Sequence, residues 1–156
     1  MQKDIDIIIY GATGFTGQLC VKYFQSLNTD VNWAIAGRDQ DKLQKVASDN
    51  SVDVEMLIAD SDDEVALDIL TSRAKVILST TGPFHRYGSK LVASCVKNSA
   101  NYVDITGENF WVKGLIAKHH EEASAKGIRI IPSCGYDSIP SDLGVFYSAK
   151  ALNKPI

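Results

Sequence analysis

Three glycines interrupt an apolar run near the start of the chain. Residues 7–17 read Ile-Ile-Ile-Tyr-Gly-Ala-Thr-Gly-Phe-Thr-Gly, and an amphipathic segment follows them, with apolar positions Leu19, Tyr23, Phe24 and Leu27. This order predicts a buried strand, a tight turn and the start of a helix. Gly11 can adopt a positive φ, Gly14 leaves open space before the helix, and Gly17 allows the helix to pack closely on the strand.

A junction of this kind predicts an anion site. The first N–H groups of a helix have no intrahelical acceptor, and the helix dipole places positive charge at the same end. The diphosphate of a dinucleotide is the anion that such strand–turn–helix units usually bind. The alternative is an ordinary glycine-rich turn. The predicted phosphate-binding residues are Gly11, Ala12, Thr13, Gly14, Phe15, Thr16 and Gly17.

The composition describes one globular domain rather than a membrane or nucleic-acid-binding protein. The 156 residues are 45% apolar and 22% charged, and 16 Lys and Arg against 19 Asp and Glu give a net charge of −3. No basic stretch, no signal-peptide core and no apolar segment of membrane-spanning length occurs. Three widely spaced cysteines favour a reducing, cytoplasmic location. No metal site is expected, because the neighbouring His119 and His120 point about 100° apart on a helix and are expected to lie on its solvated face.

Short apolar segments alternate with helical patterns along the whole chain. Strands are predicted at residues 5–10, 32–36, 54–59, 76–80, 102–105 and 128–132. Helices are predicted near residues 16–27, 39–48, 62–72, 87–98 and 109–126, and from Pro140 or Ser141 towards Ala151. This alternation predicts an α/β, Rossmann-type, doubly wound parallel sheet of order 3-2-1-4-5-6, covered by helices on both faces. The inward side chains of the third and fourth helices are expected to be Val65, Ile69, Leu70, Leu91, Val92, Cys95 and Val96.

The end of the second strand indicates which dinucleotide binds. Proteins that select NAD usually place an Asp or Glu there, on the ribose diol. Here Gly37 occupies that place and Arg38 follows it, and Lys42 lies one turn into the next helix. A guanidinium can bind a 2′-phosphate and stack on adenine. We therefore expect NADP in preference to NAD; the alternative is that Arg38 and Lys42 only form a solvated surface.

Two further strand ends are expected to contact the cofactor. Asp60 follows the third strand, where it either accepts a hydrogen bond from the adenine amino group or caps the next helix. The fourth strand is followed by small residues and a sharp Gly-Pro bend, which would let the nicotinamide ribose approach the backbone. The expected contacts here are Thr80, Thr81, Gly82, Pro83 and Phe84.

The candidates for chemistry are less specific. The Tyr-x-x-x-Lys pair of short-chain dehydrogenases is absent, because Tyr87 and Lys90 are one residue too close, as are Tyr147 and Lys150. His85 would donate a proton or lie on a surface loop, and Cys134 would face the crevice or be inert. Asp104 and Thr106 would lie in the same crevice, and Glu108 would bind a cationic substrate or cap the helix after it. The predicted substrate-side residues are His85, Tyr87, Gly107, Glu108 and Cys134.

Five segments together give the chain a family resemblance. They are Tyr10–Gly17, Ala36–Arg38, Gly82–Phe84 with Tyr87–Gly88, Tyr102–Glu108 and Cys134–Asp142, the last reading Cys-Gly-Tyr-Asp-Ser-Ile-Pro-Ser-Asp. With them the chain resembles the cofactor domain of saccharopine dehydrogenase-like oxidoreductases, a group that includes saccharopine reductases and trans-acting enoyl reductases. The resemblance implies that residues 1–156 are the N-terminal part of a longer chain with a second, substrate-shaping domain. It further implies a homodimer, and it leaves membrane or lipid-droplet association of the full chain open.

Three functions follow from these features. The first is an NADP(H)-dependent oxidoreductase domain acting on a small molecule, an imine or an activated double bond, when the full chain is present. The second is a non-catalytic NAD(P)-binding sensor or scaffold. The third is an isomerase or epimerase that retains its nucleotide.

Overall fold

The structure is a computed structural model that describes residues 3–27 and 29–153. Strands and helices alternate throughout the described residues, as the sequence pattern predicts. The strands are β1 (Ile5–Tyr10), β2 (Trp33–Gly37), β3 (Glu55–Ile58), β4 (Ala74–Ser79), β5 (Asn101–Asp104) and β6 (Ile130–Ile131). The helices are α1 (Phe15–Ser26), α2 (Gln40–Asp49), α3 (Glu64–Arg73), α4 (Phe84–Lys97), α5 (Asn109–Ala125) and α6 (Ile139–Ala151).

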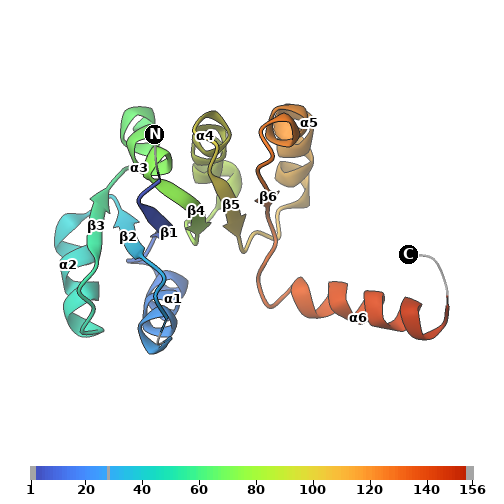
Figure 1. The fold of residues 1–156 in the computed structure, drawn as a ribbon, viewed down its shortest axis with the longest axis horizontal. Helices are drawn as coiled ribbons and strands as arrows, with labels where there is room; N and C mark the ends of the chain where they lie inside the picture. Colours follow the sequence, from blue (N-terminus) through green and yellow to red (C-terminus); the bar gives the residue numbers. More distant parts are fainter. Residues whose placement is uncertain (1–2, 28, 154–156) are drawn as a thin grey trace.

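All six strands form one parallel sheet in the order β3-β2-β1-β4-β5-β6 (Figure 1). The central strand β1 pairs with β2 on one side and β4 on the other, and Ile8 lies opposite both Ala34 and Ile77. The chain therefore reverses its winding direction between β1 and β4. The predicted fold class and strand order are confirmed.

Alternate side chains of β1 build two separate cores, because successive residues of a strand point to opposite faces. Ile9 packs with the helices α1 and α2 on one face, where its cluster includes Val21, Ile35 and Leu43. Ile8 packs on the other face, beneath α3, α4 and α5. Figure 1 shows the two groups of helices on opposite sides of the sheet.

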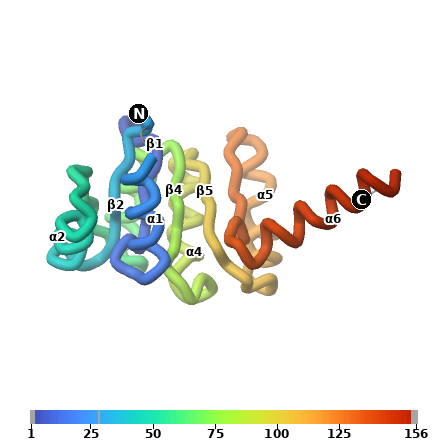
Figure 2. Tube along the Cα trace, turned by 90° about the horizontal axis from the view of Figure 1, so that it is seen from below, coloured from blue at the N-terminus to red at the C-terminus, as the bar shows by residue number. Residues whose placement is uncertain are grey.

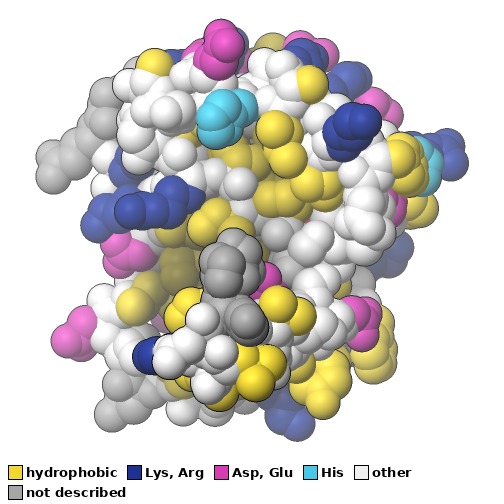
Figure 3. Space-filling view, turned by 90° about the vertical axis from the view of Figure 1, so that its right-hand side faces the viewer, with side chains coloured by type: hydrophobic (Ala, Val, Ile, Leu, Met, Phe, Trp, Pro, Cys, Tyr) yellow, Lys and Arg dark blue, Asp and Glu magenta, His cyan; other side chains and the backbone are white. Residues whose placement is uncertain are grey.

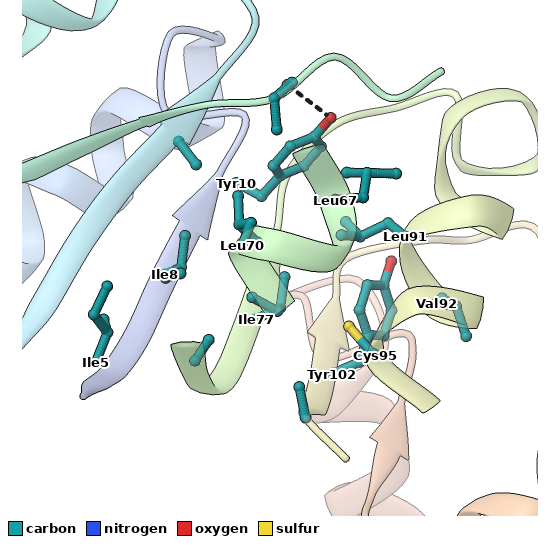
Figure 4. Packing of buried hydrophobic residues seen from close by; sticks show 14 of the residues in the cluster. Ile5, Ile8, Tyr10, Leu67, Leu70, Ile77, Leu91, Val92, Cys95 and Tyr102 are labelled. Carbon is teal, nitrogen blue, oxygen red and sulfur yellow. Dashed lines mark hydrogen bonds between the residues drawn. The ribbon is translucent and has the colours of Figure 1, made fainter. Parts of the chain in front are cut away.

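The core that contains Ile8 extends to the carboxyl ends of the strands, where it includes Tyr10. Figure 4 shows Tyr10 above Leu67, Leu70 and Leu91, and the Tyr10 hydroxyl donates a hydrogen bond of 3.3 Å to the Ala59 carbonyl. Burial raises the pKa of Tyr10 well above its ordinary value. This side chain therefore ties the end of β1 to the segment after β3 in its neutral form.

The predicted apolar face of α1 is partly wrong. Leu19 and Tyr23 are exposed, whereas Val21 is fully buried. Gly17 packs against the turn that precedes the helix, and this contact fixes how α1 is rotated about its axis. The residues one helical turn after Gly17 therefore face the sheet. The face that packs consists of Gly17, Cys20, Val21 and Phe24.

The predicted inward face of α3 is also partly wrong. Val65 and Ile69 are 71% and 58% exposed, and the buried face is formed by Leu67, Leu70 and Thr71. Burial of Thr71 is possible because its hydroxyl is satisfied, with 2.9 Å to the Leu67 carbonyl and 2.8 Å to the Ser94 hydroxyl. The sequence pattern favoured the more apolar positions and could not show this pairing between helices.

Two other boundaries differ in ways that affect the site. Helix α4 begins at Phe84, three residues earlier than predicted, so His85 lies in a helical first turn rather than in a loop. Strand β6 contains Ile130 and Ile131 alone, because these are the two residues of this segment that pair with β5. The inward face of α4, including Leu91, Val92, Cys95 and Val96, is buried as predicted.

The last helix stands apart from the sheet. Helix α6 projects beyond α5 in Figures 1 and 2, and none of its described residues is buried. Figure 3 views this end of the molecule and shows apolar side chains gathered on it. An apolar groove lies between α5 and β6. Along the described ranges, no helix combines the length and apolar character needed to cross a bilayer.

Candidate functional site

The turn between β1 and α1 is held rigidly in place. Gly11 has a φ of +87°, which an L side chain rarely adopts, and this confirms the predicted reason for a glycine there. Its N–H donates to the Ala36 carbonyl at 2.9 Å, and its carbonyl accepts from the Gly14 N–H at 3.0 Å. The Thr80 hydroxyl also donates to the Gly11 carbonyl, at 3.1 Å. The turn is therefore braced from β2 and from the end of β4.

The third glycine brings helix and turn into contact. A Cβ on Gly17 would lie 2.7 Å from the Cα of Ala12 and closer still to the Gly11 carbonyl oxygen. The close packing predicted from the sequence is confirmed. This packing points the N-terminus of α1 towards the carboxyl end of β1.

The N-terminus of α1 is open to an anion. Its N-cap is Gly14, so no side chain caps the helix, and its first turn contains no acidic residue. The N–H groups of a first helical turn lack intrahelical acceptors. They and the helix dipole supply the donors and the partial positive charge that a diphosphate needs.

A crevice of about 400 Å³ lies beside this helix end, at the carboxyl ends of β1 and β4. Ligands bind at this position in doubly wound sheets, where the strand order reverses. Most of its lining belongs to the predicted set: Gly11, Thr13, Gly14, Gly37, Arg38, Thr80, Thr81, Gly82, Pro83 and Tyr87. Tyr10 and Ser61 complete it and were not singled out from the sequence. Their signal was positional, since each lies at or just beyond a strand end.

The remaining predicted cofactor residues lie around the crevice and do not line it. Ala12 is fully buried behind the turn, and Phe84 is buried against Trp111, with ring centroids 6.0 Å apart. Phe15 is 84% exposed at the start of α1, and Thr16 follows it. Cofactor contacts by these residues stay predictions.

One orphaned atom supports a bound group. The Thr81 hydroxyl oxygen is buried and finds no hydrogen-bond partner among the described residues. Buried polar atoms are normally paired, so this atom suggests a partner that the chain does not provide. The same oxygen is among the first atoms that a Cβ on Gly11 would meet, with the Thr80 hydroxyl at 3.0 Å. Gly11 thus packs closely on the two threonines, and the amide and hydroxyl groups beside the crevice fit a dinucleotide diphosphate.

The end of β2 presents one exposed cation to the crevice. Arg38 lines it and takes part in none of the ion pairs of the described residues. Lys42 instead pairs with Asp39, Nζ to Oδ2 at 3.2 Å, and the Asp39 carboxylate also caps α2 through the Lys42 N–H at 3.0 Å. These hydrogen bonds and the Lys42 charge hold the pKa of Asp39 below its ordinary range. Arg38 is thus the better placed of the two for a phosphate.

The alternative role predicted for Asp60 is wrong. The N-cap of α3 is Asp63, whose carboxylate accepts from the N–H groups of Val65 and Ala66. Asp60 Oδ1 accepts from the Asp62 N–H at 2.9 Å, in a turn before the helix begins. Several acidic residues in succession made the capping position ambiguous from the sequence. A contact between Asp60 and adenine stays a prediction.

Glu108 caps a helix, but a different one from the helix predicted. It occupies the N-cap position of α5 without a side-chain bond there. Its carboxylate instead accepts from the N–H groups of Phe84 and His85, both at 2.8 Å, at the start of α4. His85 Nδ1 lies 2.6 Å from the same carboxylate. The structure thus brings together two predicted substrate-side residues, Glu108 and His85.

Other residues expected in the crevice are structural. Asp104 is 1% exposed, and its carboxylate accepts from the Tyr102 hydroxyl at 2.8 Å, the Thr106 N–H at 3.0 Å and the Ser133 N–H at 2.9 Å. Thr106 is equally buried, so neither residue faces the crevice. A buried carboxylate needs several hydrogen-bond donors. Asp104 takes them from the segments after β5 and β6 and so joins these two segments.

The last candidates lie on the β5–β6 side. Cys134 Sγ donates to the Ile131 carbonyl at 3.2 Å, and burial, followed by the Asp104 charge, raises the pKa of this thiol. Gly107 has open space where a side chain would be. The expected solvated surface at His119 is wrong, because this side chain is buried beside the groove between α5 and β6 and burial lowers its pKa.

Comparison with known proteins identifies the family. Residues 7–131 match the family described as saccharopine dehydrogenase NADP binding domain. The chain belongs to this family. It is therefore the NADP-binding domain of an oxidoreductase family, and the predicted preference for NADP agrees with the family.

Two relatives and one solved structure place the domain further. The chain is 39% identical to the trans-acting enoyl reductase of Mycobacterium leprae over 148 residues, 93% of this chain and 35% of that protein. It is 35% identical to the saccharopine dehydrogenase-like oxidoreductase of Mus musculus, covering 97% of this chain and 39% of that protein. Apo saccharopine dehydrogenase (L-Glu forming) from Saccharomyces cerevisiae shares the fold, with a TM-score of 0.72 and 19% identity. The match covers 96% of this chain and 31% of that one. The chain spans little more than a third of the length of these relatives.

Proposed function

We propose that this domain serves an NADP(H)-dependent oxidoreductase that acts on a small-molecule substrate. The observation that carries the proposal is the crevice, where an uncapped helix N-terminus and the exposed Arg38 meet at the strand-order reversal. When bound, the cofactor supplies or accepts a hydride. The chain supplies binding, orientation and electrostatics.

Each part of the crevice has a proposed task. The turn from Gly11 to Gly14 and the first amides of α1 bind the diphosphate. Arg38 binds the 2′-phosphate, since a guanidinium offers paired donors to phosphate oxygens. The segment 80–83 lies beside the nicotinamide half, and the Thr81 hydroxyl gains its missing partner there.

An imine or an activated double bond is the proposed substrate class. The two relatives are a trans-acting enoyl reductase and a saccharopine dehydrogenase-like oxidoreductase, and an enoyl group is an activated double bond. We also propose that residues 1–156 are the cofactor part of a longer chain, on the basis of the lengths of these relatives. A homodimer and a cytoplasmic location stay proposals, the latter supported by three unpaired cysteines.

A non-catalytic NADP-binding module is the second candidate. The observation in its favour is that Lys90 does not support Tyr87, because its Nζ lies 3.0 Å from Asp62 Oδ1. The Arg86 guanidinium lies 5.3 Å from the centre of the Tyr87 ring instead. The tyrosine–lysine chemistry of short-chain dehydrogenases is therefore not assembled here.

One substitution separates cofactor binding from folding. Gly14 is an N-cap with extended backbone, and a Cβ there would meet only the Gly11 carbonyl oxygen, at 3.4 Å. Aspartate is a favoured N-cap, so Gly14→Asp should keep or raise the unfolding temperature. It should weaken NADPH binding by about 100-fold, because its carboxylate occupies the diphosphate donors and repels phosphate. Gly14→Ser, which caps without charge, is the matched control.

Turnover distinguishes the two candidate functions. The full gene product is titrated with NADPH by calorimetry and then assayed for NADPH oxidation with a panel of imines and enoyl thioesters. Binding with turnover supports the oxidoreductase. Tight binding without turnover on any member of the panel supports the module, and equal NADPH affinity in wild type and Gly14→Asp contradicts the proposed site.

A further inference from the structure

The carboxylate of Glu108 joins two elements that are distant in the sequence. It lies in the loop between β5 and α5, and both of its oxygens accept N–H groups from the first turn of α4. The N-cap of α4 is Pro83, which has no side-chain donor or acceptor to contribute. Glu108 therefore caps α4 from outside and places negative charge at the positive end of its dipole.

The Glu108 carboxylate is held in its charged form. Its side chain is 22% exposed. Burial alone would raise its pKa, but the hydrogen bonds from the backbone of His85 and Phe84, and then from the His85 ring, bring the pKa below its ordinary value. A fixed anion is thus maintained at the start of α4.

The His85 ring is fixed on two sides. Nδ1 lies 2.6 Å from Glu108 Oε2, and the ring packs on Phe110 with centroids 5.6 Å apart. Because a carboxylate accepts hydrogen bonds and does not donate them, Nδ1 carries the proton in this contact. Nε2 makes no hydrogen bond to the described residues, and the side chain is half exposed.

The pair lies on the side of the crevice where the reacting half of a dinucleotide would extend. Pro83 and Tyr87, four residues apart on one side of α4, line the crevice. His85 lies between them in the sequence and outside the crevice lining, on the side of α4 that faces Glu108 and Phe110. In doubly wound sheets the second half of the dinucleotide lies on the β4 side of the strand-order reversal. His85 and Glu108 connect β4 and β5 on that side.

We propose that His85 is the proton donor of the reduction and that Glu108 is the residue that positions it. The inference rests on the proposed oxidoreductase function. A reduced nicotinamide dinucleotide supplies the hydride to the electrophilic carbon of the substrate. The Nε2–H bond of the imidazolium breaks, and the proton bonds to the adjacent substrate atom on which the electron pair collects. The imidazole is left neutral, with Nδ1–H still on Glu108, and recovers its proton from water.

Among the described ion pairs, His85 is paired with Glu108. Glu108 faces it from the β5–α5 loop, and Arg86 is its neighbour on α4, with the guanidinium directed to the Tyr87 ring. Phe110, from the start of α5, is uncharged. The carboxylate of Glu108 is therefore the interaction that holds Nδ1–H and leaves Nε2 without a protein partner among the described residues.

The test uses the full gene product with His85→Asn, Glu108→Gln and the control His120→Asn, a histidine on the exposed side of α5. Steady-state NADPH oxidation is measured across pH with the best substrate of the imine and enoyl thioester panel. General acid groups contribute about 100-fold or more to rate, so kcat of His85→Asn should fall by about that factor. The loss of rate on raising the pH should disappear with it. The KM for NADPH should stay within about threefold, because neither residue is assigned to cofactor binding.

Glu108→Gln isolates the positioning role. Glutamine keeps one acceptor oxygen at the start of α4, replaces the other with an NH₂ donor and carries no charge. We therefore expect kcat to fall by about tenfold with the pH limb displaced. Ring ¹⁵N shifts should show Nδ1–H in the neutral wild type and a return to Nε2–H in this variant, which a merely structural residue would not cause.

Each outcome decides between defined alternatives. A wild-type enzyme that turns over, with His85→Asn equal to His120→Asn, overturns the proton-donor assignment and leaves the proposed function standing. Turnover lost in His85→Asn with unchanged ¹⁵N shifts in Glu108→Gln overturns the role of Glu108. A wild type that binds NADPH without turnover on any substrate overturns both the proposed function and this inference.

Discussion

Gly17 and Ala12 approach so closely that a Cβ on Gly17 would lie 2.7 Å from the Ala12 Cα. We expect Gly17→Ala to destabilise the protein by about 2 kcal/mol or more, because the backbone of the turn must shift to admit the methyl group. The matched control is Gly114→Ala in α5, where a Cβ meets nothing within 4 Å. That substitution should stabilise by about 0.5–1 kcal/mol through helix propensity alone. Urea unfolding of both variants measures the difference, and equal effects would contradict the close packing.

Arg38 should determine the preference for NADPH over NADH. Arg38→Ala should weaken NADPH binding by roughly 10- to 100-fold, the effect of losing a charge-assisted pair worth about 1.5–3 kcal/mol. NADH binding should change by less than about threefold, since it has no 2′-phosphate. Lys42→Ala is the control, because Lys42 is engaged with Asp39. Calorimetry with both cofactors checks the prediction, and a loss shared equally by NADH would contradict it.

Asp104 should stabilise the segments after β5 and β6. Asp104→Ala leaves the N–H groups of Thr106 and Ser133 without their acceptor in a buried position. We expect a loss of about 3 kcal/mol, against about 1 kcal/mol for Tyr102→Phe, which removes one donor and leaves the others. Chemical unfolding gives both values. A larger loss of stability for Tyr102→Phe than for Asp104→Ala would contradict this prediction. It would show that the hydrogen bond from the Tyr102 hydroxyl stabilises the protein more than those from the two backbone N–H groups.

The contact between α3 and α4 should make stability depend on acid pH. The Asp68 carboxylate accepts from Lys97, then from Ser94 at 2.6 Å, and these bonds lower its pKa. A carboxyl whose pKa is lower in the folded state stabilises the protein above its unfolded value of about 3.9. This contribution disappears as the pH falls through the folded value.

The variant Asp68→Asn should therefore lose stability at pH 7 and show a shallower decline below about pH 4. The pair is partly exposed, so the change at pH 7 should be about 1 kcal/mol or less. The control is Asp53→Asn, an exposed residue in none of the described ion pairs. Urea midpoints at neutral and acid pH measure it. A parallel decline in Asp68→Asn and wild type would refute the linkage.

The sequence predicted those features that depend on neighbouring residues. The positive φ of Gly11, the close approach of Gly17 and the strand order all follow from local spacing and alternation. The crevice followed too, because parallel strands end at one edge and the order reverses at a known place. The end of β2 also indicated the cofactor, through the absence of a carboxylate at Gly37 and the presence of Arg38.

Other features depend on contacts between distant segments. Glu108 and Phe84 are 24 positions apart in the sequence, so the helix after Glu108 was the one that the sequence suggested it would cap. The buried face of α3 includes Thr71 because Ser94 of α4 satisfies its hydroxyl. Several acidic residues precede α3, and each could have been its N-cap. The turn before the helix is long enough that Asp63, and not Asp60, takes this position. Such choices depend on packing, which a single sequence does not display.

The sheet ends in short strands on both sides, four residues in β3 and two in β6. An outer strand exposes unpaired amides and carbonyls that can recruit a foreign chain, and brevity is one way in which proteins limit this hazard. With so few free peptide groups, neither border provides a template long enough for stacking molecules edge to edge. The domain thus keeps its six-residue strands β1 and β4 in the interior of the sheet, where both of their edges are paired.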